Sequence, residues 1–324
     1  MCTAVTYNTR GFYFGRTLDY ECTFGEEVTV TPRNFRLPLR HEGIMEKHYA
    51  IIGMAHIADG FPLYYDAGNE AGLCMAGLNF AEEACYGGED SFGKRISYFE
   101  FIPYILGRCA SVAQARAEIE RISIVGTPFS EELPVARLHW LIADREGAIT
   151  VEAVGEGVRI YDNPVGVLTN EPSFDKQMFS LNDYMSLSPR TPRNTFSEKL
   201  SLRAYSRGMG GLGLPGDVSS HSRFVRAAFV KLNSRSGDSE EESVGQLFHI
   251  LGSVEQVRGC CEVADGELEI TQYTSCFSAE RVTYYYTTYG NRQISAVDMR
   301  SCELDSTELI RYPLVLDEKI NYQN

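Results

Sequence analysis

The chain has 324 residues, of which 44% are hydrophobic and 23% charged, a composition typical of globular proteins rather than of fibres or disordered chains. Its 30 basic and 44 acidic residues leave a net charge of −14, which argues against a nucleic-acid partner because phosphate binding needs clustered Lys and Arg. No stretch approaches the roughly 20 apolar residues that span a bilayer, and the N-terminus lacks the pattern of a secretory signal. We therefore expect a cytoplasmic protein that has no membrane partner.

The nine cysteines are scattered along the chain. Disulfides are not expected in the cytoplasm, and no pair of Cys-x-x-Cys motifs has the spacing of a zinc site, so we expect no metal. The neighbouring Cys260 and Cys261 are interpreted as small hydrophobic residues that take no part in function. A thiol redox protein that depends on this pair remains an alternative.

The predicted elements fall in three blocks along the chain. Strands are predicted first, then helices mixed with strands, and finally strands again. The predicted strands are residues 3–7, 12–17, 27–31, 49–54, 77–80, 138–143, 149–154, 158–161, 166–168, 268–274, 281–286 and 293–297. The predicted helices are residues 99–110, 111–122, 174–187, 223–232 and 243–257, and a long loop is predicted at 188–220. This order favours a layered α+β fold with largely antiparallel sheets, in a single domain that spans residues 1–324.

The second residue is a cysteine, which is an unusual feature with a chemical consequence. Its side chain is small enough for Met1 to be removed, and this removal would leave one residue that carries both a thiol and a free α-amine. Such an amine can act as the base for its own side chain, which is a known way to activate a nucleophile. Taken alone, a cysteine at this position would be interpreted as accidental.

The first two predicted strands form a hairpin that brings charged residues to this cysteine. A two-residue turn at 9–10 predicts a register in which Cys2 lies opposite Thr17. Arg16 and Asp19 then lie near the N-terminus. A carboxylate can hold the amine in place, and a guanidinium favours thiolate over thiol. The sequence therefore predicts a nucleophilic site at the start of the chain.

Several motifs in this order resemble the choloylglycine hydrolase family, which comprises bile salt hydrolases and penicillin V acylases. The resemblance covers nearly the whole chain and ends near Tyr312 and Pro313. The motifs are the N-terminal segment Cys2-Thr3-Ala4-Val5-Thr6-Tyr7 and the segments at residues 13–19, 62–67, 77–80, 99–103, 138–144, 162–170, 208–215 and 222–226.

The resemblance implies an N-terminal-nucleophile (Ntn) hydrolase fold, with two stacked antiparallel sheets between layers of helices (αββα). It also implies homo-oligomers, usually tetramers, and no cofactor. The residues that match the family's catalytic positions are Cys2, Arg16, Asp19, Asn79, Asn170 and Arg223. In that pattern Cys2 is the nucleophile and its own amine shuttles the proton. Asp19 positions the amine, Arg16 lies beside the thiol, and Arg223 completes the polar site. Asn170 and its companion Asn79 form the oxyanion hole.

Two amide substrates are known in the family, namely bile acids conjugated to glycine or taurine, and penicillin V. In the family, Asn at the position of Asn79 accompanies preference for bile salts, and Tyr accompanies preference for penicillin V. The resemblance therefore implies a bile salt hydrolase. Penicillin V acylase and a non-catalytic bile-acid-binding protein remain alternatives. The residues expected by resemblance to line the substrate pocket are Leu18, Tyr20, Phe61, Tyr65 and Leu133, the last within the stretch 133–138.

Overall fold

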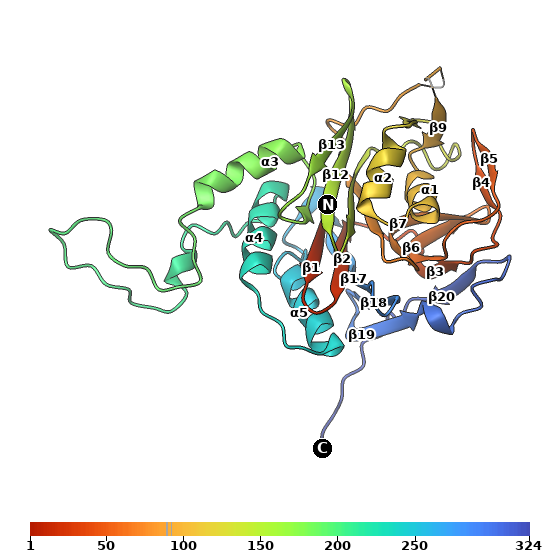
Figure 1. Ribbon diagram of the computed structural model, residues 1–324. Helices are drawn as coiled ribbons and strands as arrows, with labels where there is room; N and C mark the ends of the chain where they lie inside the picture. The colour runs from red at the N-terminus through yellow and green to blue at the C-terminus, as the bar shows by residue number, and fades with distance from the viewer. Residues whose placement is uncertain (89, 92) are drawn as a thin grey trace.

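The computed structural model describes residues 1–88, 90–91 and 93–324. Two large β-sheets are stacked on each other, and helices cover both outer faces (Figure 1). The first sheet has six strands in the order β14 (Val167–Leu168), β1 (Cys2–Asn8), β2 (Phe12–Tyr20), β17 (Ile270–Ser278), β18 (Thr283–Thr288) and β19 (Asn291–Asp298). The second has eight strands in the order β13 (Gly157–Asp162), β12 (Gly147–Val154), β11 (Leu138–Asp144), β8 (Cys74–Asn79), β7 (Phe61–Asn69), β6 (Ile51–Ala58), β3 (Glu27–Thr31) and β20 (Ile310–Pro313).

Helices α4 (Ser220–Asn233) and α5 (Glu240–Gly252) pack on the six-stranded sheet, and α1 (Phe101–Arg108) and α2 (Val112–Ile119) pack on the eight-stranded sheet. A capping box between Ser239 and Glu242 starts α5 by satisfying two otherwise unpaired backbone N–H groups. The buried face of α5 carries Leu247, Ile250 and Leu251. These residues pack against β2 and β17 on the outer face of the six-stranded sheet and belong to its hydrophobic cluster. The four layers therefore follow the order αββα.

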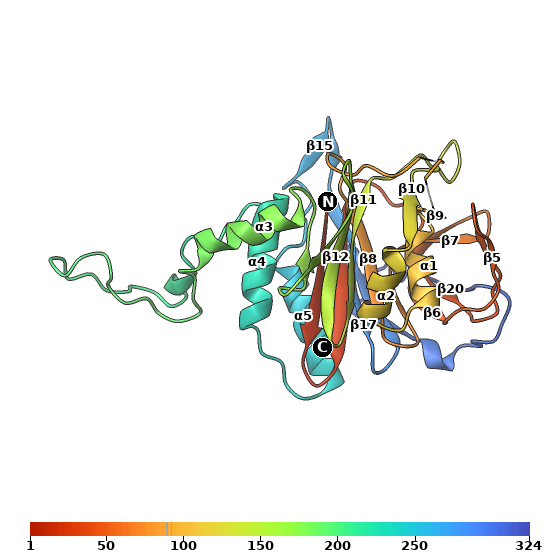
Figure 2. The same ribbon diagram turned by 45° about the horizontal axis from the view of Figure 1, so that its top comes forward.

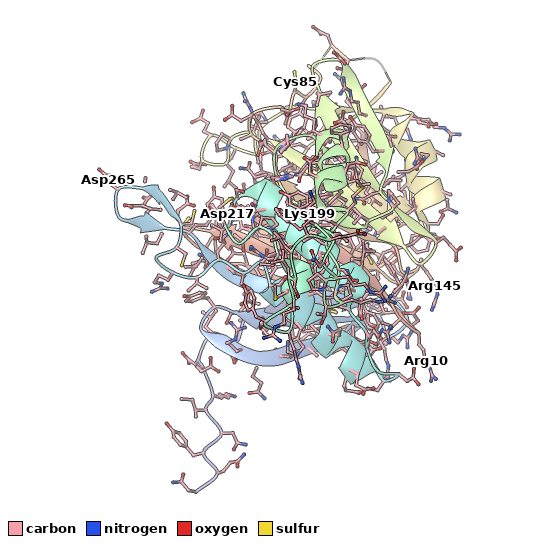
Figure 3. All side chains as sticks on the ribbon, turned by 90° about the vertical axis from the view of Figure 1, so that its left-hand side faces the viewer. Arg10, Cys85, Arg145, Lys199, Asp217 and Asp265 are labelled. Carbon is pink, nitrogen blue, oxygen red and sulfur yellow. The ribbon has the colours of Figure 1, made fainter. Side chains whose placement is uncertain are left out.

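The remaining elements are short. They are α3 (Phe174–Ser180), the 3₁₀ helices η1 (Leu181–Tyr184), η2 (Met209–Gly211) and η3 (Met299–Ser301), and three two-stranded pairs formed by β4 (Leu37–Leu39) with β5 (Gly43–Met45), β9 (Lys94–Ser97) with β10 (Ile122–Val125), and β15 (Glu262–Ala264) with β16 (Glu267–Leu268). The β15–β16 hairpin stands away from the body, with Asp265 in its turn (Figure 3). Every strand pair is antiparallel except β9 with β10, among the pairs formed by the described residues. The predicted α+β class with largely antiparallel sheets is confirmed.

The predicted register of the first hairpin was wrong by one residue. Cys2 lies opposite Leu18 and not Thr17, and Asn8 lies opposite Phe12. The loop therefore contains three residues instead of two, and the N–H of Thr9 donates to the carbonyl of Gly11 at 2.9 Å. A shift of one residue exchanges the two faces of a strand. The structure therefore sets which side chains of β2 accompany Cys2.

Strand β7 was missed from the sequence, although it supplies part of the site. Its alternation is interrupted by a β-bulge, where Met54 pairs with Asp66 and Ala55 pairs with Tyr64. Tyr65 is the extra residue. A bulge breaks the period-two pattern from which strands are recognised in a sequence.

The predicted loop at 188–220 forms an arm that extends far from the body between η1 and α4 (Figures 1 and 2). Large apolar side chains on it and at its base are exposed to solvent, namely Phe179, Met185, Phe196, Leu200, Leu202, Tyr205 and Leu212. No helix formed by the described residues is long and apolar enough to cross a membrane.

Candidate active site

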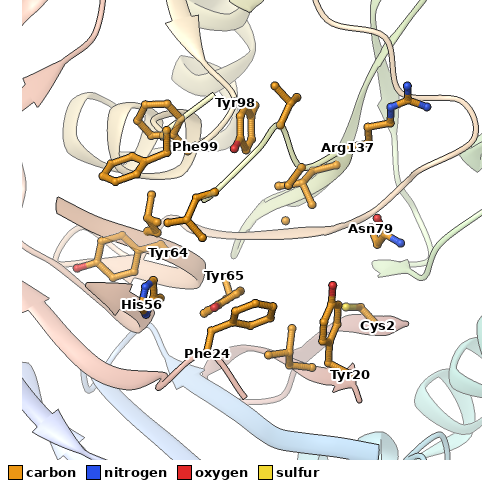
Figure 4. Close-up of a pocket in the computed structure, with 18 of the residues that line it drawn as sticks. Cys2, Tyr20, Phe24, His56, Tyr64, Tyr65, Asn79, Tyr98, Phe99 and Arg137 are labelled. Carbon is orange, nitrogen blue, oxygen red and sulfur yellow. The ribbon is translucent and has the colours of Figure 1, made fainter. Parts of the chain in front are cut away.

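Cys2 begins strand β1 and lies at one end of a cavity of about 640 Å³. In Figure 4, Cys2 and Tyr20 lie at this end, and Tyr64 and Phe99 lie at the other. The cysteine is only 5% exposed, but its side chain lines the cavity. Its thiol can therefore meet a ligand in the cavity while most of the residue is shielded from water.

Arg16 lies on β2 beside Cys2 and is fully buried. Its Nη1 donates to the carbonyl of Tyr65 at 3.1 Å and to that of Gly77 at 2.8 Å, and its Nε donates to its neighbour Thr17. The bulge in β7 leaves Tyr65 without a partner on β6, and the carbonyl of Tyr65 accepts from this guanidinium. Nη2 has no hydrogen-bond partner within the described part of the protein. A buried donor without a partner at the cavity wall is suited to a negatively charged group.

A second buried charge, Asp66, lies behind Arg16 and was missed from the sequence. Its carboxylate accepts hydrogen bonds from Tyr273 at 2.6 Å, Tyr284 at 2.7 Å and Ser275 at 2.9 Å. The Oγ of Ser275 in turn accepts from the backbone N–H of Arg16 at 3.2 Å. Burial alone would lower the pKa of Arg16, but the acidic groups around it, including Cys2 and Asp66, raise that pKa above its usual value. Arg16 is therefore held as a cation.

Asn170 follows β14 and joins three parts of the site. Its Oδ1 accepts from the N–H of Cys2 at 2.9 Å and from Nη2 of Arg223 at 2.7 Å. Its Nδ2 donates to the carbonyl of Asn79 at 2.8 Å. The side chain of Asn79 stands at the end of β8 and lines the cavity (Figure 4). Asn79 and Asn170 are therefore brought together, as the sequence predicted.

Arg223 extends from the first turns of α4 to the start of β1. Its Nη1 donates to the carbonyl of Cys2 and to Oγ1 of Thr3, the latter at 2.7 Å, and its Nε donates to Val218 at 2.9 Å. Burial lowers the pKa of Arg223 from its usual value. The guanidinium thus fixes the first strand against the helix layer and is not among the residues that line the cavity.

Asp19 is fully buried, and its carboxylate accepts from Thr271 at 2.6 Å and from Thr17 at 3.1 Å. Burial raises the pKa of Asp19, although Arg223 and the N-terminal amine act against this rise. The amine of Met1 donates to the carbonyl of Asp19 at 2.6 Å and forms an ion pair with Glu269. Glu269 was missed from the sequence, since it lies about 250 residues away from Asp19 and no motif marks it. The N-terminus is thus held between β2 and the start of β17.

The cavity is lined mainly by aromatic and aliphatic side chains. Four of the five predicted pocket residues line it, namely Leu18, Tyr20, Tyr65 and Leu133, and so does the stretch 133–138. Phe61 does not line it, contrary to expectation. Its ring packs against Phe99 and Phe129, which do face the cavity, with centroid distances of 5.6 Å and 6.0 Å. Phe61 therefore supports the wall from behind.

All nine cysteines are free. Cys260 is exposed and Cys261 is partly buried, because both lie after α5 in the connection that leads to the outlying β15–β16 hairpin. The described residues contain no group of three or more His, Cys, Asp or Glu that could hold a metal ion.

Comparison with known proteins agrees with this geometry. The family model of the linear amide C-N hydrolases, choloylglycine hydrolase family, matches residues 2–312. The chain belongs to this family. A bile salt hydrolase/transferase of Lactiplantibacillus plantarum is 55% identical over 314 residues, which are 97% of each chain. A protein of the same name from Clostridium perfringens is 37% identical and is covered over the full length of both chains.

Solved structures support the same fold. A C2A mutant of the conjugated bile acid hydrolase from Clostridium perfringens superposes with a TM-score of 0.92 at 37% identity, and both chains are covered completely. The penicillin V acylase of Agrobacterium tumefaciens superposes with a TM-score of 0.75 at 21% identity, over 97% of this chain and 92% of that chain. The latter likeness concerns the fold alone. The predicted αββα architecture and the predicted family are confirmed, and the protein is an enzyme of the class that hydrolyses linear amide C–N bonds.

Proposed function

We propose that this enzyme hydrolyses the amide bond of bile acids conjugated to glycine or taurine, with Cys2 as the nucleophile once Met1 has been removed. The observation that carries the proposal is the position of Cys2 at the end of a large apolar cavity, directly beside Arg16. An apolar pocket of this kind suits a steroid skeleton, and polar groups at one end suit its amide. The relatives at 55% and 37% identity bear the name bile salt hydrolase/transferase.

In the proposed mechanism the free α-amine of Cys2 takes the proton of the thiol, and the thiolate attacks the amide carbonyl carbon. The unpartnered Nη2 of Arg16 favours the thiolate. As the C=O bond becomes a single bond, negative charge develops on the oxygen. The amide groups of Asn79 and Asn170 donate to this oxygen, and each such donor contributes about 10²–10³ in rate.

The intermediate then collapses and the C–N bond breaks. The α-ammonium of Cys2 returns its proton to the departing nitrogen, so glycine or taurine leaves as an amine and a thioester remains on Cys2. Water attacks the thioester while the same amine accepts its proton, which releases the free bile acid and restores the thiol. Asp19 and Arg223 position the start of β1 for both steps.

Penicillin V is the alternative substrate within the family. Asn79 at the cavity wall favours bile salts, because the family's preference for penicillin V goes with Tyr at this position. A non-catalytic bile-acid-binding protein would use the cavity but would not need an intact Cys2, Arg16, Asp19 and Asn170. We therefore place bile salt hydrolysis first.

We further propose a homo-oligomer, with four subunits by resemblance to the family, in which the arm contacts a second copy of the chain. The apolar side chains of the arm support this, since monomeric proteins rarely expose such a group of residues together. We also propose that the chain acts as one domain, because strands of both sheets contribute to one hydrophobic cluster. We propose that it lies in the cytoplasm, where thiols such as its nine free cysteines are kept reduced.

The test is product release from glycocholate, taurocholate and penicillin V at equal concentration, with the intact mass recorded on the same sample. We expect rapid release of cholate by a protein that lacks Met1. Preferential cleavage of penicillin V would change the assigned substrate to penicillin V and leave the proposed mechanism unchanged. The absence of turnover by a protein without Met1 would refute the proposal.

A further inference from the structure

His139 lies on β11, and no part of its side chain is exposed. Both of its ring nitrogens face acceptor atoms. Nε2 lies 2.8 Å from the carbonyl oxygen of Thr169, and Nδ1 lies 3.2 Å from Oε1 of Glu152. Because a carbonyl oxygen only accepts, Nε2 carries a hydrogen and donates it to Thr169. His139 is thus bonded to the residue that directly precedes Asn170.

The ring of His139 also contacts the neighbour of the other asparagine. Phe80 follows Asn79, and its ring stacks on the imidazole with a centroid distance of 4.3 Å and an interplanar angle of 5°. Phe80 is itself fully buried, and its N–H donates to the carbonyl of Arg137 at 2.8 Å. The stacked ring of Phe80 thus connects His139 to the backbone next to Asn79.

Glu152 completes this buried unit. Its Oε1 also accepts from the N–H of Phe174 at the start of α3, at 2.9 Å. A proton lies between Nδ1 of His139 and Oε1 of Glu152, since a carboxylate and an unprotonated ring nitrogen would both be acceptors. The position of the imidazole ring is thus set from two sides, by Glu152 and by Thr169.

We propose that His139 is a positioning residue that sets the distance between the two asparagines of the oxyanion hole. It touches neither substrate nor Cys2 and acts through Phe80 on one segment and through Thr169 on the other. The inference rests on the proposed function, because it assumes that Asn79 and Asn170 stabilise the oxyanion. A misplacement of about 1 Å in such a site can cost about 10²-fold in rate.

Two variants of similar polarity separate the contacts of the ring. His139→Gln places an amide nitrogen near the position of Nε2 and keeps a donor for Thr169. His139→Asn places one near Nδ1 and loses that donor. We expect kcat for glycocholate to fall about 10- to 100-fold in H139N, which loses both the stacked ring and the donor to Thr169, with KM changed less than about twofold. The fall should be smaller in H139Q, which loses the stacked ring but keeps the donor.

The readout that distinguishes positioning from general damage is the rate at which iodoacetamide alkylates Cys2, followed by mass. Alkylation needs the thiol but no oxyanion hole, so we expect it to stay within about twofold of the wild type in both variants. The matched control is His48→Asn. His48 is also buried and both of its ring nitrogens also face acceptors, the carbonyls of Tyr49 and Phe35, but neither of these residues adjoins Asn79 or Asn170.

A wild-type kcat in folded H139N would overturn the inference, and so would an equal loss of kcat and alkylation in H139N. If neither histidine variant folds, Phe80→Leu decides, since it removes the stacked ring alone. A lower kcat with unchanged alkylation supports the inference, and no change in either refutes it. The wild type is assayed first, because its failure to cleave glycocholate would reject the proposed function independently of the variants.

Discussion

Substitution of Asn170 by alanine tests the oxyanion hole most directly. The side chain makes three hydrogen bonds, with the N–H of Cys2, with Nη2 of Arg223 and with the carbonyl of Asn79. Loss of one oxyanion donor should lower kcat about 10²–10³-fold, which corresponds to about 3–4 kcal/mol of transition-state stabilisation. The buried guanidinium of Arg223 also loses a partner, which costs about 1–3 kcal/mol of folding stability.

Asn163→Ala provides a control variant whose expected loss of folding stability is similar to that of Asn170→Ala. Asn163 is 3% exposed, as Asn170 is, and it also makes three hydrogen bonds, to Thr150, Gly166 and Val167. Unlike Asn170, it makes none of these hydrogen bonds to Cys2, Asn79 or Arg223.

The assay measures kcat per alkylatable Cys2, together with the melting temperature of each variant. Both variants should melt at lower temperature, but only N170A should lose two or more orders of magnitude in kcat. A loss in N170A no larger than that in the Asn163 variant would refute the oxyanion role.

Three further predictions follow from the same structure. Cys2→Ser should nearly abolish hydrolysis, because serine is a poorer nucleophile at neutral pH, and a variant that retains most of its activity would reject the mechanism. Burial lowers the pKa of Lys231 from 10.5 to about 8. The unfolded chain therefore binds more protons than the folded protein between about pH 8 and 10.5, and the free energy of unfolding should rise with pH in this window, by about 3 kcal/mol in total. Urea denaturation should show this rise as a difference between the wild type and Lys231→Met, and a difference independent of pH would contradict it. The double variant Phe196→Ser and Tyr205→Ser should yield smaller species in light scattering, because both side chains on the arm are more than 80% exposed. An unchanged assembly would exclude this part of the arm from the contact.

Local sequence patterns determined most of the elements. Strand β3 was predicted at the bounds that the structure has, and α4 and α5 were found from their apolar spacing. Such patterns are visible because each element buries one face with a fixed period. The sequence missed β7, where the bulge at Tyr65 breaks the period of the strand. It also missed six strands of three or four residues, which are too short to show a period, namely β4, β5, β9, β10, β15 and β20.

The sequence by itself also determined the family and its candidate residues, because these depend on motifs that are each contiguous in the chain. Only the tertiary structure decided which buried residues contact these candidate residues. Asp66 is linked to Arg16 through Ser275 on β17, a strand that lies some 200 residues further along the sequence. Glu269, at the start of the same strand, forms the ion pair with the amine of Met1. Phe61 does not line the cavity, because two aromatic rings from other segments, Phe99 and Phe129, pack against it on the cavity side. The physical reason is the same in each case. Burial of a charge or a ring is decided by what packs against it from distant parts of the chain, and one sequence alone contains no local signal for such a contact.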